Sequence, residues 1–186
     1  MKKFNLKNIS RLFLVTLLAM ISASCASTIE MYRRTPVGEV EVKEIPKMKA
    51  YTTSVKGEFF NSNKELFGRL YRYMKYYSLE MTVPVVVKTD PPTMSFYVPE
   101  CCMKKELRNM DDVKVVTMPA ITVVSAGVRG KYDKRNYEKG KKMIEEWLKK
   151  NSDYVADGNY FITYWSCPSW WTFAMKGEVN LPVKMK

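Results

Sequence analysis

Two stretches of the chain carry apolar side chains at the spacing of an amphipathic helix. In residues 61–78 the apolar positions recur every three or four residues, at Leu66, Phe67, Leu70, Tyr71, Tyr73, Met74 and Tyr77. In residues 133–151 they are Tyr137, Met143, Ile144, Trp147 and Leu148. This period gathers the apolar side chains on one face of a helix. The pattern therefore predicts two helices, each packed against a core by one face.

Shorter runs rich in β-branched and aromatic residues follow each helix. Residues 81–89 and 93–98 follow the first helix and are separated by the turn sequence Asp90-Pro91-Pro92. Residues 159–165 and 174–183 follow the second helix. Such runs, bounded by Pro and Asp, are typical of strands joined by turns.

The stretches that precede the two helices match each other at a shift of 73 residues. The sequence has Val, Pro, Val and Gly at positions 42, 46, 55 and 57, and the same residues recur at 115, 119, 128 and 130. Each half therefore predicts a strand-helix-strand-strand repeat, and together they predict an α+β fold with one antiparallel sheet and a helix from each half. We expect a single domain over residues 40–186, with halves at about 40–99 and 113–183.

The N-terminus has the pattern of an export signal. A basic start with Lys2, Lys3, Lys7 and Arg11 precedes an apolar run over residues 12–21 and then small residues around Cys25. A basic start, a short apolar run and small residues after it are typical of a secretory signal peptide, and a run of ten residues is too short for a spanning helix. We expect residues 1–25 to be the signal and residues 26–39 to be a short connecting segment.

Two cleavage sites remain open at this signal. Small residues at Ser24 and Ala26 suit cleavage after Ala26, which would release a secreted protein, whereas Ala23-Ser24-Cys25 resembles a bacterial lipobox. A lipidated Cys25 would attach the chain to a membrane, and a basic surface would reinforce contact with anionic lipid. We therefore expect a periplasmic or membrane-anchored lipoprotein, or alternatively a secreted protein.

Composition excludes several kinds of site. The chain contains no His, which removes His-based general acid–base catalysis, Ser-His and Cys-His dyads, and zinc sites that need imidazole. No Cys-x-x-Cys spacing occurs. Two alternatives remain for Cys101, Cys102 and Cys167: one of the adjacent pair forms a disulfide with Cys167, or all three remain thiols. We expect no metal site and, for an exported chain whose charged helix face is solvated, no nucleic-acid partner.

Four short motifs give the chain a resemblance to a known family. They are Met81-Thr82-Val83-Pro84-Val85, then Phe96-Tyr97-Val98-Pro99, Gly127-Val128-Arg129-Gly130 and Lys176-Gly177-Glu178-Val179. In this order they resemble the SOUL/haem-binding protein family over about residues 40–183. The resemblance implies a twisted, distorted barrel-like antiparallel sheet flanked by two helices. It also implies non-enzymatic binding of haem or another tetrapyrrole.

The resemblance also implies a ligand cleft between the first helix and a loop near the C-terminus. The matching positions, with the aromatic residues beside them, are Phe67, Leu70, Met74, Lys75, Tyr164, Trp165, Trp170 and Trp171. Aromatic and thioether side chains suit stacking on a macrocycle, and a lysine can meet a propionate. The family's Tyr-Asp-Pro-Pro loop lacks its Asp here, and without His any haem binding should be weak or mainly hydrophobic.

Two other functions remain open from the sequence alone. The same fold could bind or sense another apolar small ligand, because nothing in the aromatic composition is specific for a tetrapyrrole. A hydrolase with a single acidic residue in the cleft is the second alternative. No paired carboxylates, Gly-rich phosphate loop or nucleophile elbow is present, so we expect no enzyme and assign no catalytic residue.

Overall fold

A computed structural model describes residues 28–166 and 174–186 of the chain. The expected signal peptide and its Cys25, together with Cys167, Trp170 and Trp171, lie outside these described residues. The helices are α2 (Phe59–Tyr76), α3 (Lys134–Lys150) and the short 3₁₀ helix η1 (Glu100–Cys102). The strands are β1 (Ile29–Glu30), β2 (Val40–Ile45), β3 (Met48–Ser54), β4 (Thr82–Val83), β5 (Val85–Thr89), β6 (Pro92–Tyr97), β7 (Lys114–Met118), β8 (Ile121–Arg129), β9 (Tyr154–Ala156), β10 (Phe161–Tyr164) and β11 (Lys176–Met185).

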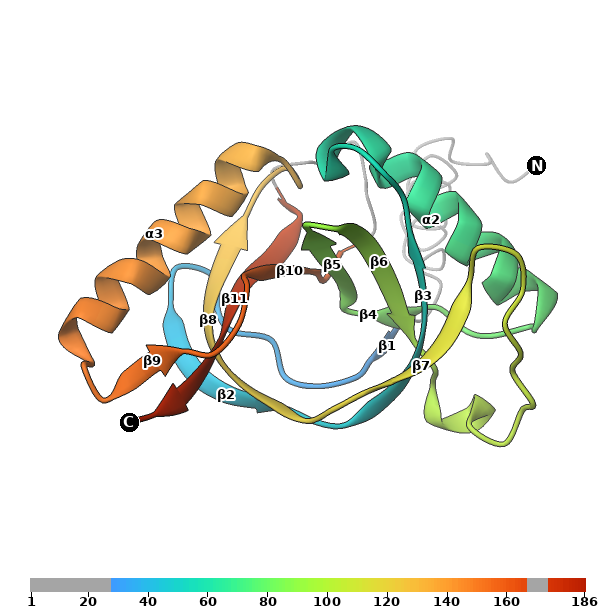
Figure 1. Cartoon of the computed structure of the whole chain (residues 1–186), viewed down its shortest axis with the longest axis horizontal. Coiled ribbons are helices and arrows are strands. Elements are labelled where there is room, and N and C mark those ends of the chain that lie inside the picture. The colour runs from blue at the N-terminus through green and yellow to red at the C-terminus, as the bar shows by residue number, and fades with distance from the viewer. Residues whose placement is uncertain (1–27, 167–173) are drawn as a thin grey trace, which may run out of the picture.

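One large antiparallel sheet organises these elements. Its strand order is β2-β8-β11-β10-β5-β6-β3-β7, and β9 pairs with the outer part of β11. The sheet curls into a half-barrel, and the two helices lie along its outer side (Figure 1). Helix α3 covers β8 and β11, and α2 covers β3, β5 and β6. This arrangement confirms the predicted α+β class with a curled antiparallel sheet and two helices.

Both predicted helices form close to their expected positions. Helix α2 begins two residues before the predicted start and ends at Tyr76, and α3 spans residues 134–150 of the expected 133–151. The Asp133 carboxylate accepts the backbone N–H of Asn136 at 3.0 Å, which is an N-cap of the kind that satisfies the first turn of a helix. Lys149 and Lys150 lie in the last turn of α3, where positive charge interacts favourably with the negative end of the helix dipole.

The strand order has a feature that bears on the predicted internal repeat. The strands β2, β3, β5 and β6 of the first half correspond to β7, β8, β10 and β11 of the second half. If each strand is replaced by its counterpart, the same order is read from the opposite edge of the sheet. The edge strand of each half pairs with a strand of the other half, so the two halves are interleaved. The repeat itself stays a prediction that superposition of the two halves would test.

Alternation along the central strands divides the core between the two faces of the sheet. Val85 and Val87 of β5 pack under α2, whereas Val86 points into the concave interior of the curl. On the neighbouring strand β10, Tyr164 faces the helix side and Phe161 faces the interior. Because successive side chains of a strand point to opposite faces, one pair of strands supplies walls on both sides of the sheet.

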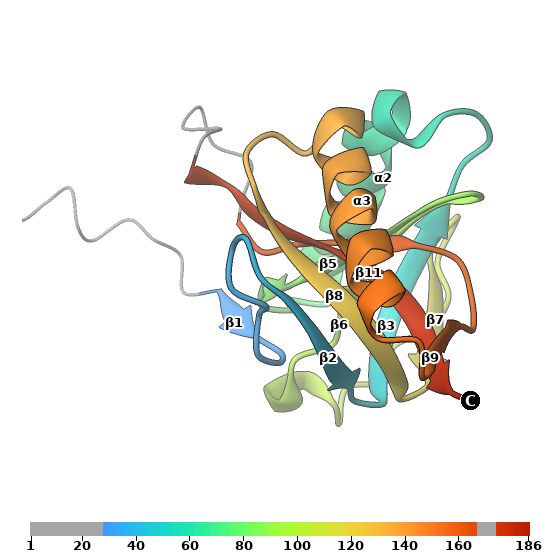
Figure 2. The same cartoon turned by 90° about the vertical axis from the view of Figure 1, so that its left-hand side faces the viewer.

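Residues 28–39 lie at one side of the curled sheet before β2 begins (Figure 2). Strand β1 pairs in parallel with β4, and Val37 bridges Gly127 of β8. A Cβ atom on Gly127 would lie 2.1 Å from the carbonyl oxygen of Pro36, so only glycine allows this approach. The segment is therefore held against the sheet at β4 and β8.

Helix α3 lies very close to the sheet at Gly140. This glycine is buried, and a Cβ atom there would lie 2.3 Å from Cγ2 of Val179 on β11. Gly68 in α2 offers a matched position, because a Cβ atom there would meet nothing within 4 Å. Alanine substitutions at the two glycines therefore distinguish the effect of close packing on stability from the effect of helix propensity.

We expect Gly140→Ala to lower the free energy of unfolding by about 1–3 kcal/mol, because overpacking outweighs the gain in helix propensity. Gly68→Ala should raise it by up to about 1 kcal/mol, because alanine is the better helix former and has free space. Denaturant titrations of the two variants measure both effects. Stabilisation by both substitutions would contradict the close packing of α3.

Candidate functional site

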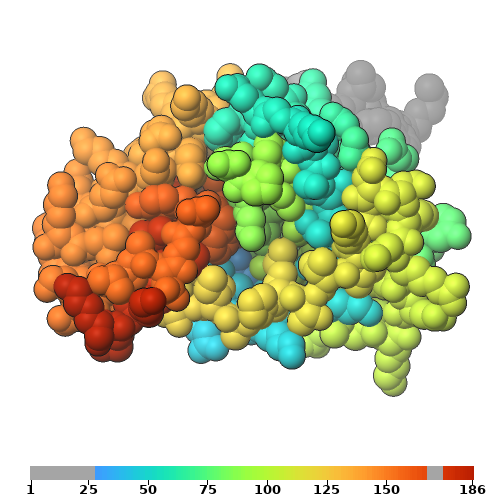
Figure 3. Space-filling view, viewed as in Figure 1, coloured from blue at the N-terminus to red at the C-terminus, as the bar shows by residue number. Residues whose placement is uncertain are grey.

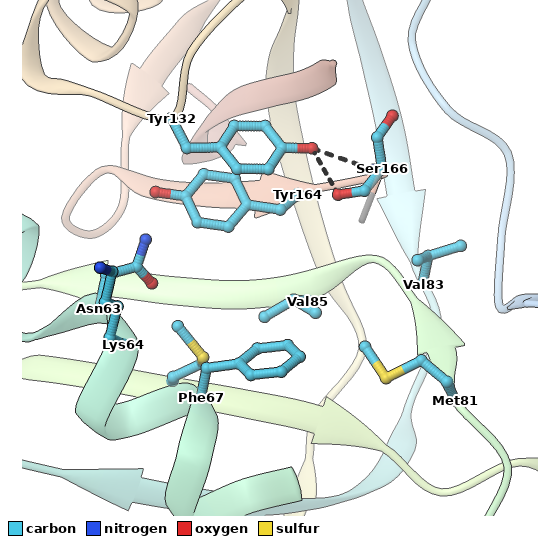
Figure 4. Close-up of a pocket in the computed structure, with 10 residues that line it drawn as sticks. Asn63, Lys64, Phe67, Met81, Val83, Val85, Tyr132, Tyr164 and Ser166 are labelled. Atoms are coloured by element: carbon cyan, nitrogen blue, oxygen red, sulfur yellow. Dashed lines mark hydrogen bonds between the residues drawn. The ribbon is translucent and has the colours of Figure 1, made fainter. Parts of the chain in front are cut away.

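An apolar pocket of about 330 Å³ opens on the helix side of the sheet. Helix α2 contributes Asn63, Lys64 and Phe67 to one wall (Figure 4). The floor comes from β4, β5, β6 and the residue before β4, through Met81, Val83, Val85 and Met94. The opposite wall is formed by Tyr132, Tyr164 and Ser166. The pocket therefore lies between the first helix and the start of the loop near the C-terminus.

A stacked pair of tyrosines forms the wall opposite α2. The rings of Tyr132 and Tyr164 lie 3.7 Å apart between centroids, with 12° between their planes. The Tyr132 hydroxyl accepts the backbone N–H of Ser166 at 3.0 Å and lies 2.8 Å from the carbonyl oxygen of Lys176, which accepts from it. These bonds join the Gly130–α3 connection to the ends of β10 and β11, and they fix the ring orientation (Figure 4). The wall is thus a preformed flat aromatic surface.

The hydroxyl of Tyr164 is the polar feature inside this wall. Tyr164 is buried, and its hydroxyl has no hydrogen-bond partner among the described residues. In Figure 4 this hydroxyl points away from Ser166, toward the side of the pocket where Asn63 lies. Burial, with smaller contributions from Tyr132 and Asp133, raises the pKa of the Tyr164 phenol, so it is a neutral donor at physiological pH. A buried hydroxyl without a partner is unfavourable.

The cation at the pocket is Lys64, at the edge of the α2 wall. Its side chain is exposed and no ion pair joins it to another described residue. No carboxylate from the described residues lines this pocket. The site can therefore hold a flat apolar body by dispersion and stacking, and attract an anionic substituent at one edge.

The structure brings together only part of the predicted site. Phe67 and Tyr164 both line the pocket. Leu70 and Met74 point into the core beneath α2, where they are 0 % and 5 % exposed. Lys75 is exposed, lies over the ring of Tyr71 at 5.4 Å, and does not line the pocket.

Of the three tryptophans in the predicted site, Trp165 lies among the described residues. Trp165 is buried on the opposite face of the sheet, where its ring meets Tyr32 edge-on at 5.2 Å between centroids. Trp170 and Trp171 lie outside the described residues, so their part in the cleft stays a prediction.

Several lining residues were not singled out from the sequence. Met81, Val83 and Val85 belong to the motif that carried the family resemblance, and that motif was the signal that could have placed them in the site. Tyr132 follows Gly130 by two residues in the second half, and Met94 is a buried residue of β6 on the side of the sheet that faces α2. Neither has a sequence signal that separates it from ordinary core residues.

A buried ion pair lies on the other face of the sheet. Glu178 of β11 is fully buried, and its carboxylate lies 2.7 Å from Nζ of Lys43 on β2. The same carboxylate accepts the backbone N–H of Thr35 at 2.5 Å and the hydroxyl of Thr163 at 2.8 Å. Burial lowers the pKa of Lys43, while Glu178 opposes that effect. The Glu178 carboxylate therefore links Thr35, strand β2 and strand β10 to β11.

The described residues contain no group of three or more His, Cys, Asp or Glu side chains that could hold a metal ion. Within the same residues, no helix is both long enough and apolar enough to cross a membrane. Cys101 and Cys102 are free thiols whose sulfur atoms lie 3.3 Å apart.

Solved structures share this fold at low sequence identity. The C-terminal domain of EcmrR has a TM-score of 0.64 at 18 % identity, covering 80 % of this chain and 98 % of that domain. The longer EcmrR chain in its complex with DNA gives 0.63 at 17 % identity, and 58 % of its length is covered. A hydrolase from Listeria innocua gives 0.56 at 16 % identity, with 85 % of this chain and all of that chain covered. At these identities the likeness shows the fold alone.

Family comparison extends over most of the chain. No curated protein matches the sequence. The SOUL heme-binding protein family matches residues 29–182, which include both helices, the large sheet and the pocket between α2 and Tyr164. The chain therefore belongs to the SOUL heme-binding protein family.

Proposed function

We propose that the chain binds haem or another tetrapyrrole in the pocket between α2 and the Tyr132–Tyr164 pair, without catalysing a reaction on it. The observation that carries this proposal is the preformed aromatic wall, with rings 3.7 Å apart, in an otherwise apolar pocket of a SOUL-family chain. A flat macrocycle offers a large surface to such a wall. Family membership supports haem or tetrapyrrole binding in general, and this pocket is the location that we propose for it.

The residues present fit a tetrapyrrole by shape more than by metal ligation. The pocket of about 330 Å³ is near the lower end for ligand sites and is open to solvent, so part of a macrocycle would remain outside. Lys64 at the rim suits a propionate on that outer edge. The chain has no His to supply an imidazole ligand, so the affinity rests on stacking, apolar burial and this rim charge.

Binding of another apolar small ligand is the second candidate, and the mainly apolar lining of the pocket supports it. Apart from Asn63, Lys64, Ser166 and the two tyrosine hydroxyls, every lining residue is apolar. Such a lining does not by itself select a tetrapyrrole. Charge at the rim distinguishes the two candidates, because haem carries propionates and a neutral apolar ligand does not.

A charge reversal at the rim tests the proposal. We expect Lys64→Glu to weaken haem binding about tenfold, because it replaces attraction to a propionate by repulsion at a cost of about 1.4 kcal/mol. The dimethyl ester of protoporphyrin, which lacks the propionate charges, should bind the variant and the unaltered protein equally. Absorbance titration with hemin and fluorescence titration with the ester measure the two affinities.

Lys75→Glu is the matched control, because Lys75 lies on the same helix but outside the pocket. It should leave hemin affinity unchanged. Equal weakening by both variants would show that net charge, not the pocket, governs binding. Absence of saturable binding of either tetrapyrrole would overturn the proposed function and leave the neutral apolar ligand.

A further inference from the structure

A second cavity of about 450 Å³ opens on the concave side of the sheet. It lies away from the pocket between α2 and Tyr164, which is called the tetrapyrrole pocket after the proposed function. Figure 3 shows the hollow between the β5–β6 turn, the β7–β8 turn and the segment before β10. Its inner walls come from six strands, through Ile45, Val86, Tyr97, Met118, Ile121 and Phe161. The cavity is therefore the open end of the curled sheet's interior.

The two cavities lie back to back across the strands β5 and β10. Val85 lines the tetrapyrrole pocket, and its neighbour Val86 lines the second cavity. Tyr164 and Phe161 divide in the same way on β10. Since adjacent strand residues point to opposite faces, the sheet itself separates the two spaces.

The rim of the second cavity determines which ligand it suits. Lys88 and Asp90 stand at the β5–β6 turn, and Asp157 stands on the segment before β10. Asp157 is neutralised by Lys184, whose Nζ lies 2.7 Å from its carboxylate. One cation and one anion remain at the mouth, so the rim carries no net charge and does not select an anion or a cation.

An open apolar interior of this size is unfavourable in water. Protein interiors are normally close-packed, and exposed apolar walls lose the free energy that burial would provide. A cavity of about 450 Å³ lies within the range of small-molecule sites. Asn159 at the mouth offers an amide that can both donate and accept a hydrogen bond to an uncharged polar end.

We propose that this concave cavity is a second binding site, which takes an uncharged, largely apolar small molecule with its polar end at the rim. The site is independent of the tetrapyrrole pocket, because the two share strands but no lining residue.

Two partly exposed methionines allow a matched test with the neutral fluorescent probe Nile red. Met118→Trp fills the concave cavity, and Met81→Trp fills the tetrapyrrole pocket. We expect the Met81→Trp variant to bind Nile red still, and the double variant Met81→Trp/Met118→Trp to bind it at least tenfold more weakly. Met118→Trp alone should leave hemin affinity unchanged, which also shows that the variant is folded.

Three results would overturn the second site. They are loss of Nile red binding in Met81→Trp alone, equal probe binding by the Met81→Trp single and double variants, and loss of hemin binding in a folded Met118→Trp. Failure of hemin to bind the unaltered protein would overturn the proposed function instead. It would leave the Nile red comparison unaffected.

Discussion

Glu178→Ala is expected to lower the free energy of unfolding by about 3–5 kcal/mol, the usual cost of removing one partner from a buried ion pair. The Glu178 carboxylate is fully buried and accepts hydrogen bonds from Lys43, Thr35 and Thr163. Its loss leaves the Lys43 ammonium without this counter-ion. The charge is then poorly solvated, because the Lys43 side chain is only 10 % exposed. The Thr35 N–H, which holds residues 28–39 against the sheet, also loses its acceptor.

Glu106→Ala is the matched control for this effect. Glu106 forms an ion pair with Arg108 at 2.8 Å, but both side chains are more than 70 % exposed. An exposed pair of this kind contributes at most about 1 kcal/mol. Denaturant titration should therefore separate the two Glu→Ala variants clearly, and similar losses would mean that water reaches the Lys43–Glu178 pair.

A second substitution tests whether the loss of stability comes from the unpaired charge of Lys43. Lys43→Met in the Glu178→Ala background removes the ammonium while keeping an apolar side chain of similar length. We expect the double variant to be more stable than Glu178→Ala alone, because an unpaired buried charge costs more than a missing pair. A further loss of stability would show that Lys43 acts by packing.

Sequence periodicity predicted the long elements of this fold and missed the short ones. The helices at Phe59–Tyr76 and Lys134–Lys150 each span more than four turns, so their apolar faces repeat often enough to locate them within two residues. Strands β1 and β9 contain two and three residues, too few to show alternation, and their positions depend on tertiary pairing with β4 and β11. The predicted strand over residues 81–89 forms as the two strands β4 and β5.

The candidate site was predictable to a smaller extent. The cleft between the first helix and the end of β10 agrees with the family resemblance, and Phe67 and Tyr164 are in it. Tyr164 and Trp165 cannot line the same face, because they are consecutive at the end of a strand, and that rule could have been applied to the sequence. Tyr132 is held at the site by its stack on Tyr164 and by the hydrogen bonds of its hydroxyl to residues 166 and 176, which are tertiary contacts without a local sequence pattern.

Helix α2 shows why an apolar face does not identify ligand contacts. Phe67, Leu70 and Met74 lie on one face at spacings of three and four. Leu70 and Met74 enter the core beneath the helix, as Leu66 does one turn before Leu70, whereas Phe67 is only partly buried and lines the pocket. The apolar spacing alone does not show which of these residues the sheet covers and which one the pocket leaves open.

Leu70→Ala is therefore expected to affect stability and spare binding. Leu70 is completely buried between α2 and the sheet, so its truncation should lower the free energy of unfolding by about 2–5 kcal/mol through lost burial and a residual cavity. Hemin titrated into the folded variant should bind as it does to the unaltered protein, because the Leu70 side chain does not line the pocket. Phe67→Ala, one turn earlier on the same helix, should weaken hemin binding, because it removes an aromatic wall of the pocket. Weaker hemin binding by Leu70→Ala, with stability retained, would instead place Leu70 in contact with the ligand, as the family resemblance implied.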